Sequence, residues 1–441
     1  MKMEFTYQDY LDNYAAEDRW LPKGPLEPWK CIDQGIFPTD DVAVDKLVED
    51  TKADFAKRLG GDYYEKFDRA RTLSLGYGSK MFPAYQFLFY DIACEDWLSL
   101  VDFHKGFGRD HSVHQPLTAY IVSKLLGRGN PDDAFYIGGE SLFNMALDAI
   151  LDEPDSQYLR DRLAFYDNNS PLLQGNRELW RQVFYQTAII TAMYHDLGYP
   201  WQFIEQMHDT QKDDILFFGR LSYADPDIDP NNNNIINPVV DNYIGTHHDE
   251  LMFRPFYRYG KGGLTTANIN KKIFEKYLHT SHGVPGAVAF WRYNDAYSTM
   301  AGVPLAGLIK FCQEWSCLAI LMHDMQKAYA QAGSGFARLD FKTDPLSFII
   351  ALADTLEDFN RPNAIINPTA IGCEISYSFP SLAVDLLEDN GVAEIYYTVD
   401  AGKKGEQEYY KSKDQKKLFD QPDGYFDLKS LGLKSLTIKC K

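Results

Sequence analysis

Apolar residues recur at a helical period of about 3.6 residues through long windows between residues 96 and 365. Few stretches of this segment alternate strictly between apolar and polar residues, which is the pattern of a half-buried strand. At 441 residues, the chain is longer than one hydrophobic core usually serves, so we expect more than one structural unit. The sequence therefore predicts a mainly α protein whose largest unit is a helical domain over residues 96–365.

The two regions that flank this segment differ from it in character. Residues 1–95 are rich in aromatic side chains and include a helical pattern over 41–59, so we expect them to pack on the core. In residues 366–441 we predict strands at 373–379, 393–400 and 435–440, and a helix at 381–390. This pattern is typical of a small C-terminal α+β appendage. An Asn-, Asp- and Pro-rich stretch at 225–238 indicates a loop, which we place in an insertion covering about residues 200–278.

Charge and hydropathy narrow the classes of partner. The 44 Lys and Arg residues against 63 Asp and Glu give a net charge of −19, which disfavours general attraction to a long polyanion. No apolar run approaches the roughly 20 residues needed to cross a bilayer, and the opening residues MKMEFTYQDYLDNY contain no apolar h-region. The six cysteines form no CxxC pair, so we interpret them as reduced thiols. We therefore expect a cytoplasmic protein with no membrane partner.

Several widespread catalytic motifs are missing from the sequence. It contains no GxxxxGK[ST] loop, no GxGxxG after a predicted strand, no GxSxG elbow and no HExxH helix. P-loop, dinucleotide-binding, α/β-hydrolase and zincin mechanisms therefore have no support. Candidate chemistry has to come from histidines and carboxylates, and all ten histidines lie between residues 104 and 323.

One His-Asp pair lies at the end of a well-defined predicted helix. Apolar residues recur at helical spacing over 178–196, and Gly198 and Pro200 provide the stop, so His195 and Asp196 fall in the last turn. Neighbouring residues on a helix point about 100° apart, yet both can contact one ion placed beyond the helix end. His-Asp pairs also recur by chance, and the sequence has four: His195-Asp196, His208-Asp209, His248-Asp249 and His323-Asp324.

Two other predicted helices carry ionisable residues on their apolar faces. Asp354 continues the i, i+4, i+8 row that begins with Leu346 and Ile350. A buried carboxylate needs a salt bridge, for example to Arg361, a set of hydrogen bonds or a cation. In the predicted helix 307–330, His323 shares a face with Trp315 and Ala319 and should point inward, whereas Asp324 should point outward or sideways.

Two further segments each place a histidine beside a predicted helix. Pro116 suits a first helical turn and Gly127 suits a stop, which puts His114 at the entrance of the helix between them. His282 precedes a Gly-rich turn that opens another helical stretch. Five separate segments thus supply imidazoles or carboxylates.

The order of these residues resembles the HD-domain metal-dependent phosphohydrolase superfamily. The strings that carry the resemblance are DHSVHQPLTAYIV, YHDLGYP, SHGVPGAVAF, LAILMHD and DPLSFIIALADTLEDFNR, and together they span residues 110–361. The resemblance implies an HD-domain helical bundle that binds one or two divalent metal ions. It also implies the ligands: His114, His195, Asp196 and Asp354 for the first ion, and Asp196, His282 and His323 for the second.

Some assignments within this resemblance stay open. His111 competes with His114, and the long gap of 85 residues before His282 leaves His247, His248 and His279 as alternatives. Relatives often have a Lys after the His-Asp pair, whereas this sequence has Leu197, Gly198 and Tyr199. A phosphate-binding cation would then come from Arg109, Arg292 or Arg361. We expect Asp196, Arg109 and Arg361 to act in catalysis.

The expected donor set of imidazoles and carboxylates suits Mn, Fe, Ni, Co, Zn or Mg. The second ring nitrogen of each imidazole needs an acceptor, and Asp110 or Glu357 could provide one. The resemblance implies hydrolysis of a phosphomonoester or phosphodiester, with a small phosphorylated or nucleotide-type substrate favoured over single-stranded nucleic acid by the acidic net charge. Two alternatives use the same residues: an HD-fold di-iron oxygenase, and a catalytically silent nucleotide sensor whose appendage contacts a partner.

Overall fold

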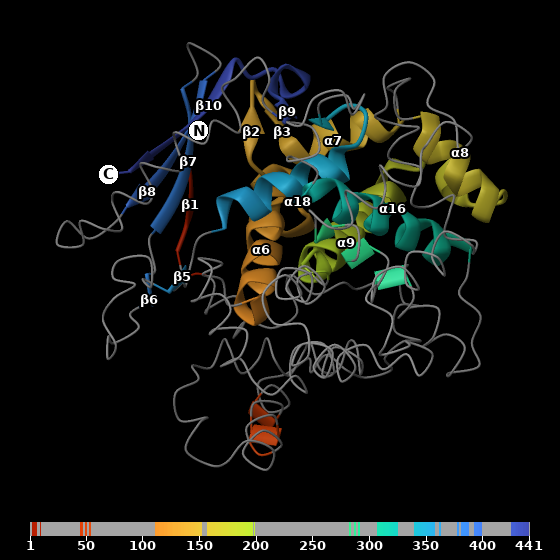
Figure 1. Cartoon of the computed structure of the whole chain (residues 1–441). Coiled ribbons are helices and arrows are strands. Elements are labelled where there is room, and N and C mark those ends of the chain that lie inside the picture. Colours follow the sequence, from red (N-terminus) through yellow and green to blue (C-terminus); the bar gives the residue numbers. More distant parts are fainter. Residues whose placement is uncertain are drawn as a thin grey trace, which may run out of the picture.

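The computed structural model describes a helical core, a small sheet and several short segments (Figure 1). The described residues are 2–6, 9, 45–46, 49–50, 53, 111–151, 157–196, 198, 282–283, 286–287, 290–291, 307–324, 339–357, 361–362, 377–378, 381–387, 392–398 and 425–440. They are mostly helical, as the sequence predicts. The predicted insertion at 200–278 lies outside them, and the domain boundaries stay a prediction.

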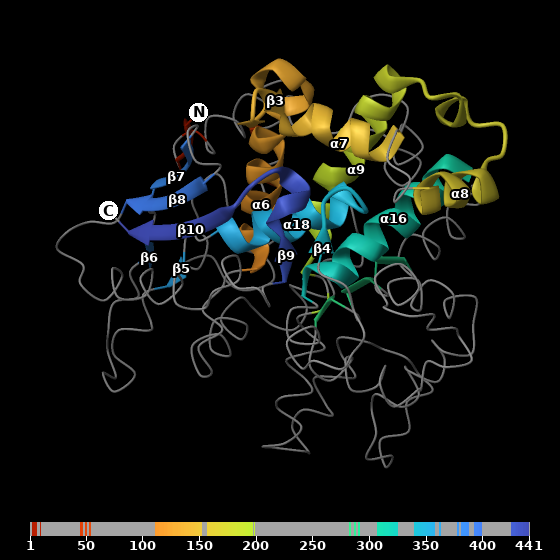
Figure 2. The ribbon, with the colours of Figure 1, turned by 90° about the horizontal axis from the view of Figure 1, so that it is seen from above.

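Four helices form the centre of the core. α9 and α16 are buried along most of their length and pack against each other, against α18, and, in the case of α9, against α6. α7 and α8 lie at the periphery, with α8 on the side away from the sheet (Figure 2). The helices are α6 (His111–Leu125), α7 (Leu142–Leu151), α8 (Gln157–Tyr166), α9 (Arg177–Tyr194), α16 (Gly307–His323) and α18 (Pro345–Leu356).

Local sequence explains where these helices begin. The Asn176 side chain accepts a hydrogen bond from the Leu179 backbone N–H at 3.1 Å and so caps α9. Asp344 caps α18 in the same way, followed by Pro345 at the first helical position. α6 begins at His111, so the expectation that Pro116 opens this helix is wrong, and Pro116 lies in its second turn.

Interlocked aromatic side chains hold α9 and α16 together away from their C-terminal ends. The Trp180 ring of α9 contacts Phe311 and Trp315 of α16 edge-on, at centroid distances of 6.1 and 6.4 Å. Phe184 lies 5.7 Å from Trp315. Both tryptophans are almost fully buried. Burying side chains of this size stabilises the folded state by on the order of several kcal/mol. The C-terminal ends of both helices are thereby fixed side by side.

A four-stranded sheet lies beside α6 and α18 in both views (Figures 1 and 2). Its order is β1 (Lys2–Phe5), β7 (Ser381–Leu387), β8 (Val392–Thr398), β10 (Ser435–Cys440). β10 pairs with β8 in parallel, and the other pairs are antiparallel. The prediction of β10 is confirmed, and β8 agrees with the predicted strand over residues 393–398.

The predicted helix at residues 381–390 is wrong, because residues 381–387 form strand β7. An apolar run of this length does not distinguish a helix from a strand by its periodicity. β7 pairs with the distant β1 on one side and with β8, the next strand along the chain, on the other, so its backbone pairing with both decides its conformation. The first residues of the chain therefore contribute a strand to the C-terminal sheet.

The last described segment also packs on the helical core. β9 (Phe426–Asp427) pairs in parallel with β4 (Leu339–Asp340), which leads into α18. The Tyr425 hydroxyl donates a hydrogen bond to the Met322 carbonyl in the last turn of α16. The remaining short elements are β2 (Tyr136–Ile137), β3 (Glu140–Ser141), β5 (Arg361–Pro362), β6 (Tyr377–Ser378) and the 3-10 turns Gly127–Gly129, Pro131–Asp133, Pro171–Gln174 and Leu428–Leu431.

The length and hydropathy of the helices also bear on membrane insertion. None of those in the described ranges is both long enough and apolar enough to pass through a bilayer.

Candidate metal centre

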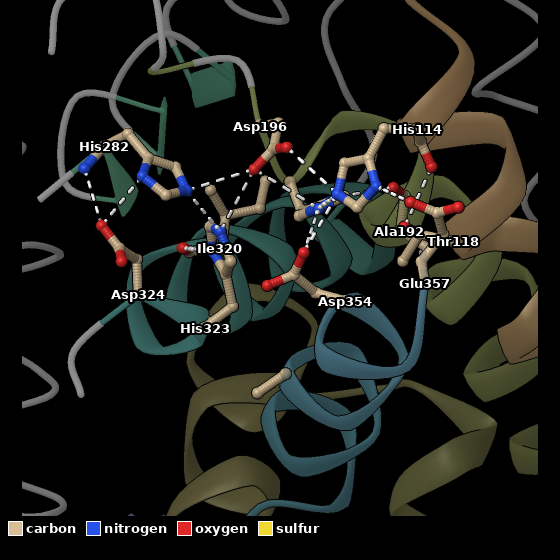
Figure 3. Close-up of polar contacts among 12 residues, drawn as sticks. His114, Thr118, Ala192, Asp196, His282, Ile320, His323, Asp324, Asp354 and Glu357 are labelled. Carbon is tan, nitrogen blue, oxygen red and sulfur yellow. Dashed lines mark hydrogen bonds and ion pairs between the residues drawn. The ribbon is translucent and has the colours of Figure 1, made fainter. Parts of the chain in front are cut away.

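Six ionisable side chains from five segments meet in the helical core (Figure 3). They come from the first turn of α6, the end of α9, the segment at residue 282, the last residue of α16, and α18. Their donor atoms form two groups, and within each group all of these atoms lie within 4.8 Å of one another. The first donor group is His114, His195, Asp196 and Asp354, and the second donor group is Asp196, His282 and His323.

The first donor group is held by three helices. His114 Nε2 lies 3.2 Å from His195 Nε2, 3.0 Å from Asp354 Oδ1 and 3.3 Å from Asp196 Oδ2. His195 Nε2 lies 3.3 Å from Asp196 Oδ1 and 3.5 Å from Asp354 Oδ1. Two imidazole nitrogens and two carboxylates therefore face a common point between α6, α9 and α18.

The second donor group shares Asp196 with the first. Asp196 Oδ1 lies 3.2 Å from His282 Nε2 and 3.4 Å from His323 Nε2. The two imidazole nitrogens are 2.9 Å apart. In Figure 3, Asp196 lies between His282 on one side and His114 on the other. Asp196 is thus the side chain through which the two groups are joined.

The centre is almost completely removed from solvent. His195 and Asp196 are 0% exposed, and Asp354 is the most exposed member at 14%. A carboxylate buried as deeply as Asp196 costs several kcal/mol unless a positive charge or hydrogen bonds compensate it. The protonation of the surrounding imidazole rings therefore bears directly on how the buried charge of Asp196 is compensated.

Each imidazole presents its other ring nitrogen, Nδ1, to an acceptor. His195 Nδ1 lies 2.7 Å from the Ala192 carbonyl, and His323 Nδ1 lies 2.5 Å from the Ile320 carbonyl. A carbonyl oxygen only accepts, so both Nδ1 atoms carry the proton, and in a neutral ring the Nε2 lone pair then points into the centre. The Nδ1 atoms of the remaining two rings face carboxylates: Glu357 for His114 and Asp324 for His282.

Converging lone pairs and carboxylates attract positive charge. Burial lowers the pKa of His195, although Asp196 and Asp354 act in the opposite direction. Burial also opposes protonation of His282, yet the negative charges of Asp324 and Asp196 and their hydrogen bonds raise its pKa to about 10. In the first donor group, the inward Nε2 of a neutral His195 and the carboxylates of Asp196 and Asp354 are all acceptors, so they cannot all be satisfied by hydrogen bonds to one another. A divalent cation would satisfy them, and in the second donor group a cation would take the place of the proton that His282 otherwise carries on Nε2.

The donor chemistry fits such an ion. Imidazole nitrogens and carboxylate oxygens suit borderline to hard divalent metals. Among the residues that the structure describes, no cysteine joins either group. Cys312 and Cys317 are buried in α16, and burial raises the pKa of the Cys312 thiol to about 12. The cluster is therefore compatible with a mononuclear or dinuclear metal site.

The structure brings together all six residues expected as ligands, and their role as ligands stays a prediction. Glu357 contacts His114 as one of the two acceptors anticipated from the sequence. Asp354 Oδ1 faces the imidazoles of His114 and His195. The alternatives and the phosphate-binding candidates lie outside the described residues or have side chains that do: Asp110, His111, His247, His248, His279, Arg109, Arg292 and Arg361.

Sequence reasoning missed the role of Asp324. We expected this side chain to point outward or sideways, but it contacts both the backbone N–H and Nδ1 of His282. α16 ends at His323, so Asp324 lies just past the helix and the angular rule for helical neighbours does not set its direction. The signal that could have found it is the second inward-facing His-Asp pair, because the pair repeats the arrangement of His195 and Asp196.

Glycines let the backbone around His282 approach the centre. A Cβ on Gly198 would lie 1.8 Å from the His282 carbonyl oxygen, and one on Gly283 would lie 2.7 Å from the Leu321 carbonyl. Only glycine permits backbones to come this close. These close approaches explain why the chain has glycine shortly after Asp196 and directly after His282.

Fold and site together define a helical protein with a buried His/Asp cluster that is compatible with a metal site. Comparison with known proteins finds no matching family model, no similar curated protein and no similar solved structure.

Proposed function

We propose that the protein is an HD-domain metal-dependent phosphohydrolase that acts on a phosphomonoester or phosphodiester, with a nucleotide-type substrate. The observation that carries this proposal is the sharing of Asp196 between two buried donor groups. One carboxylate contacting imidazoles on both sides is the arrangement expected for two neighbouring cations. The order of the ligand residues along the chain, which resembles that superfamily, supports the same reading.

Each residue of the centre has a defined task in this proposal. His114, His195 and Asp354 hold the first ion, His282 and His323 hold the second, and Asp196 contacts both. Divalent cations bound there would lower the pKa of a water molecule and neutralise charge on phosphoryl oxygens. Glu357 and the carbonyls of Ala192 and Ile320 keep the Nδ1 protons in place, so that the Nε2 lone pairs stay directed inward.

Substrate choice follows from charge. The net charge of −19 favours a small phosphorylated molecule over a long polyanion, which the whole surface would repel. We assign phosphate binding to Arg109 and Arg361, because both flank the segment that contains the ligand residues. Electrostatic contacts that a substrate makes inside the water-poor centre are stronger than the same contacts in bulk water.

The experiment combines metal analysis of the purified protein with a panel of nucleotides and phosphodiesters. The proposal predicts bound divalent metal and metal-dependent phosphate release that falls at least about a hundredfold in an Asp196→Ala variant. Asp161→Ala is the matched control, because Asp161 is an exposed carboxylate on α8. Circular dichroism of both variants establishes that any loss is not unfolding.

Two outcomes would replace the proposal. Iron-dependent oxygen uptake without phosphate release would identify a di-iron oxygenase built on the same residues. Tight nucleotide binding without turnover of any substrate would identify a nucleotide sensor.

A further inference from the structure

We propose that Asp324 is a positioning residue that holds His282 in the orientation and tautomer required by the second cation. The inference rests on the proposed function, since it presupposes a cation in each donor group. It assigns to Asp324 an effect on the second cation that the first cation does not share.

The contacts of Asp324 fix His282 at two points. Asp324 Oδ2 accepts a hydrogen bond from the His282 backbone N–H at 2.8 Å and lies 2.9 Å from His282 Nδ1 (Figure 3). The first contact places the main chain of residue 282 against the end of α16, and the second sets the rotation of the ring. With a carboxylate this close, Nδ1 keeps its proton, so a cation in the second donor group would take the place of the Nε2 proton, on the side of the ring that faces Asp196.

The other histidines of the two groups do not depend on such a contact in the same way. His195 and His323 donate from Nδ1 to carbonyls three residues earlier in their own chain segments, so their orientation is built into α9 and α16. His114 lies within α6, which fixes its main chain, and Glu357 supplies the Nδ1 acceptor. His282 precedes the helical turn at residue 283, and its main chain is tied to α16 by Asp324.

The composition of the two groups makes the second cation more sensitive to this contact. The first donor group has four members and two carboxylates, whereas the second has three members and only the shared carboxylate of Asp196. Losing one well-oriented imidazole removes a larger share of the second group. The negative charge of the Asp324 carboxylate also makes the His282 ring a stronger electron donor than a neutral acceptor would.

The experiment is a titration of the metal-free full-length protein with Mn²⁺, followed by calorimetry and electron paramagnetic resonance. The wild type should bind two ions and show the spectrum of a magnetically coupled pair. Asp324→Ala should weaken the second ion about 10- to 100-fold, leave the first within about threefold, and replace the coupled spectrum by that of isolated Mn²⁺. Asp324→Asn keeps the shape and one acceptor oxygen, so it should recover part of the lost affinity.

Glu357→Gln serves as the reciprocal variant, because Glu357 contacts His114 in the first donor group. It should weaken the first ion more than the second, which a general loss of folding would not do. Asp161→Ala should bind both ions as the wild type does. If Asp324→Ala does not fold, Asp324→Asn carries the test by its smaller, selective loss of the second ion.

Unchanged affinity for the second ion in both Asp324 variants would overturn the inference, as would a wild type that binds a single ion. Equal weakening of both ions would also overturn it, because the effect would then not be specific to His282. Failure of the proposed function has a different signature. A wild type that binds two ions with the predicted Asp324 dependence, yet releases no phosphate from any substrate, would leave the inference standing and remove the phosphohydrolase.

Discussion

Asp196 occupies a position that no other residue of the centre shares. Its Oδ2 faces His114, and its Oδ1 faces His195, His282 and His323. Among the other five residues of the centre, Asp354 contacts only the two histidines of the first donor group, His114 and His195. The two carboxylates should therefore have different effects when they are neutralised.

We predict that Asp354→Asn loses the first ion selectively and that Asp196→Asn loses both. Replacing a charged oxygen donor by an amide weakens cation binding, and only Asp196 is shared. The measurement is metal content by mass spectrometry after desalting in limiting Mn²⁺. Equal metal loss in both variants would show that Asp196 is not shared between two ions.

A substitution at Gly198 tests how closely the segment after Asp196 approaches the segment around His282. Gly198→Ala would put a Cβ 1.8 Å from the His282 carbonyl oxygen, so backbone has to move. We expect a loss of about 2–4 kcal/mol in the free energy of unfolding, at or above the usual cost of overpacking. Urea denaturation provides the measurement.

Gly175→Ala is the control for that substitution. Gly175 has a φ of +75°, and a Cβ added to it would meet no heavy atom within 4 Å, so only backbone strain of about 1–2 kcal/mol is expected. A Gly198→Ala protein as stable as the wild type would mean that the two segments do not press together as described.

At the level of elements, periodicity and capping predicted much of the helical core. α9 ends at Tyr194, just before the His195 and Asp196 that the sequence places in its last turn, and α18 starts at Pro345, as the start signal in the local sequence predicts. β7 could not be predicted from its own periodicity, because it is fixed by pairing with the distant β1 on one side and with the following strand β8 on the other. The predicted direction of the Asp324 side chain is wrong for a related reason, because helical geometry does not set the direction of a residue just past a helix end.

An ion-pair network ties the N-terminal residues to α6. Lys124 Nζ lies 2.6 Å from Asp9 Oδ2 and also donates to the Glu4 carbonyl, while Arg128 lies 3.4 Å from Asp9 Oδ1. Partial burial opposes ionisation of Asp9, but the hydrogen bonds from Lys124 and Tyr120 and the nearby cations outweigh it and lower its pKa. The charged form of Asp9 is therefore stabilised by folding.

This shift predicts the pH dependence of an Asp9→Asn variant. A lowered folded pKa contributes stability above the ordinary Asp pKa of 3.8, and that contribution is lost as pH falls through the folded value. Because Asp9 is 35% exposed, solvent screening limits the difference from wild type to about 0.2–1 kcal/mol at pH 7. Urea unfolding at pH 7 and at pH 3 should show the difference shrinking, and a difference that grows on acidification would contradict it.

At the scale of the whole molecule, the centre joins residues that lie up to 240 positions apart in the chain. Each local pattern could be recognised in the sequence, yet their convergence depends on the packing of α6, α9, α16 and α18. The order of the ligand candidates along the chain predicts their convergence only because that order resembles a known superfamily. The local sequence patterns by themselves predict no contact between them. The pairing of β1 with β7 likewise joins the first residues to a distant segment.

Because the donor groups draw on several helices, metal binding should stabilise the entire core. A ligand at 100 times its dissociation constant stabilises the folded state by about 2.7 kcal/mol per site. We predict that chelation lowers the unfolding temperature and that added Mn²⁺ restores it. Asp196→Asn should show neither effect, and an equal response of this variant to Mn²⁺ would indicate binding elsewhere.

Anomalous diffraction from crystals grown with Mn²⁺ would show whether Asp196 joins two cation-binding groups. We predict two anomalous peaks, one on either side of Asp196: the first among His114, His195 and Asp354 and the second between His282 and His323. Crystals in which Mn²⁺ binds only away from Asp196, or in which these side chains do not contact any ion, would contradict it.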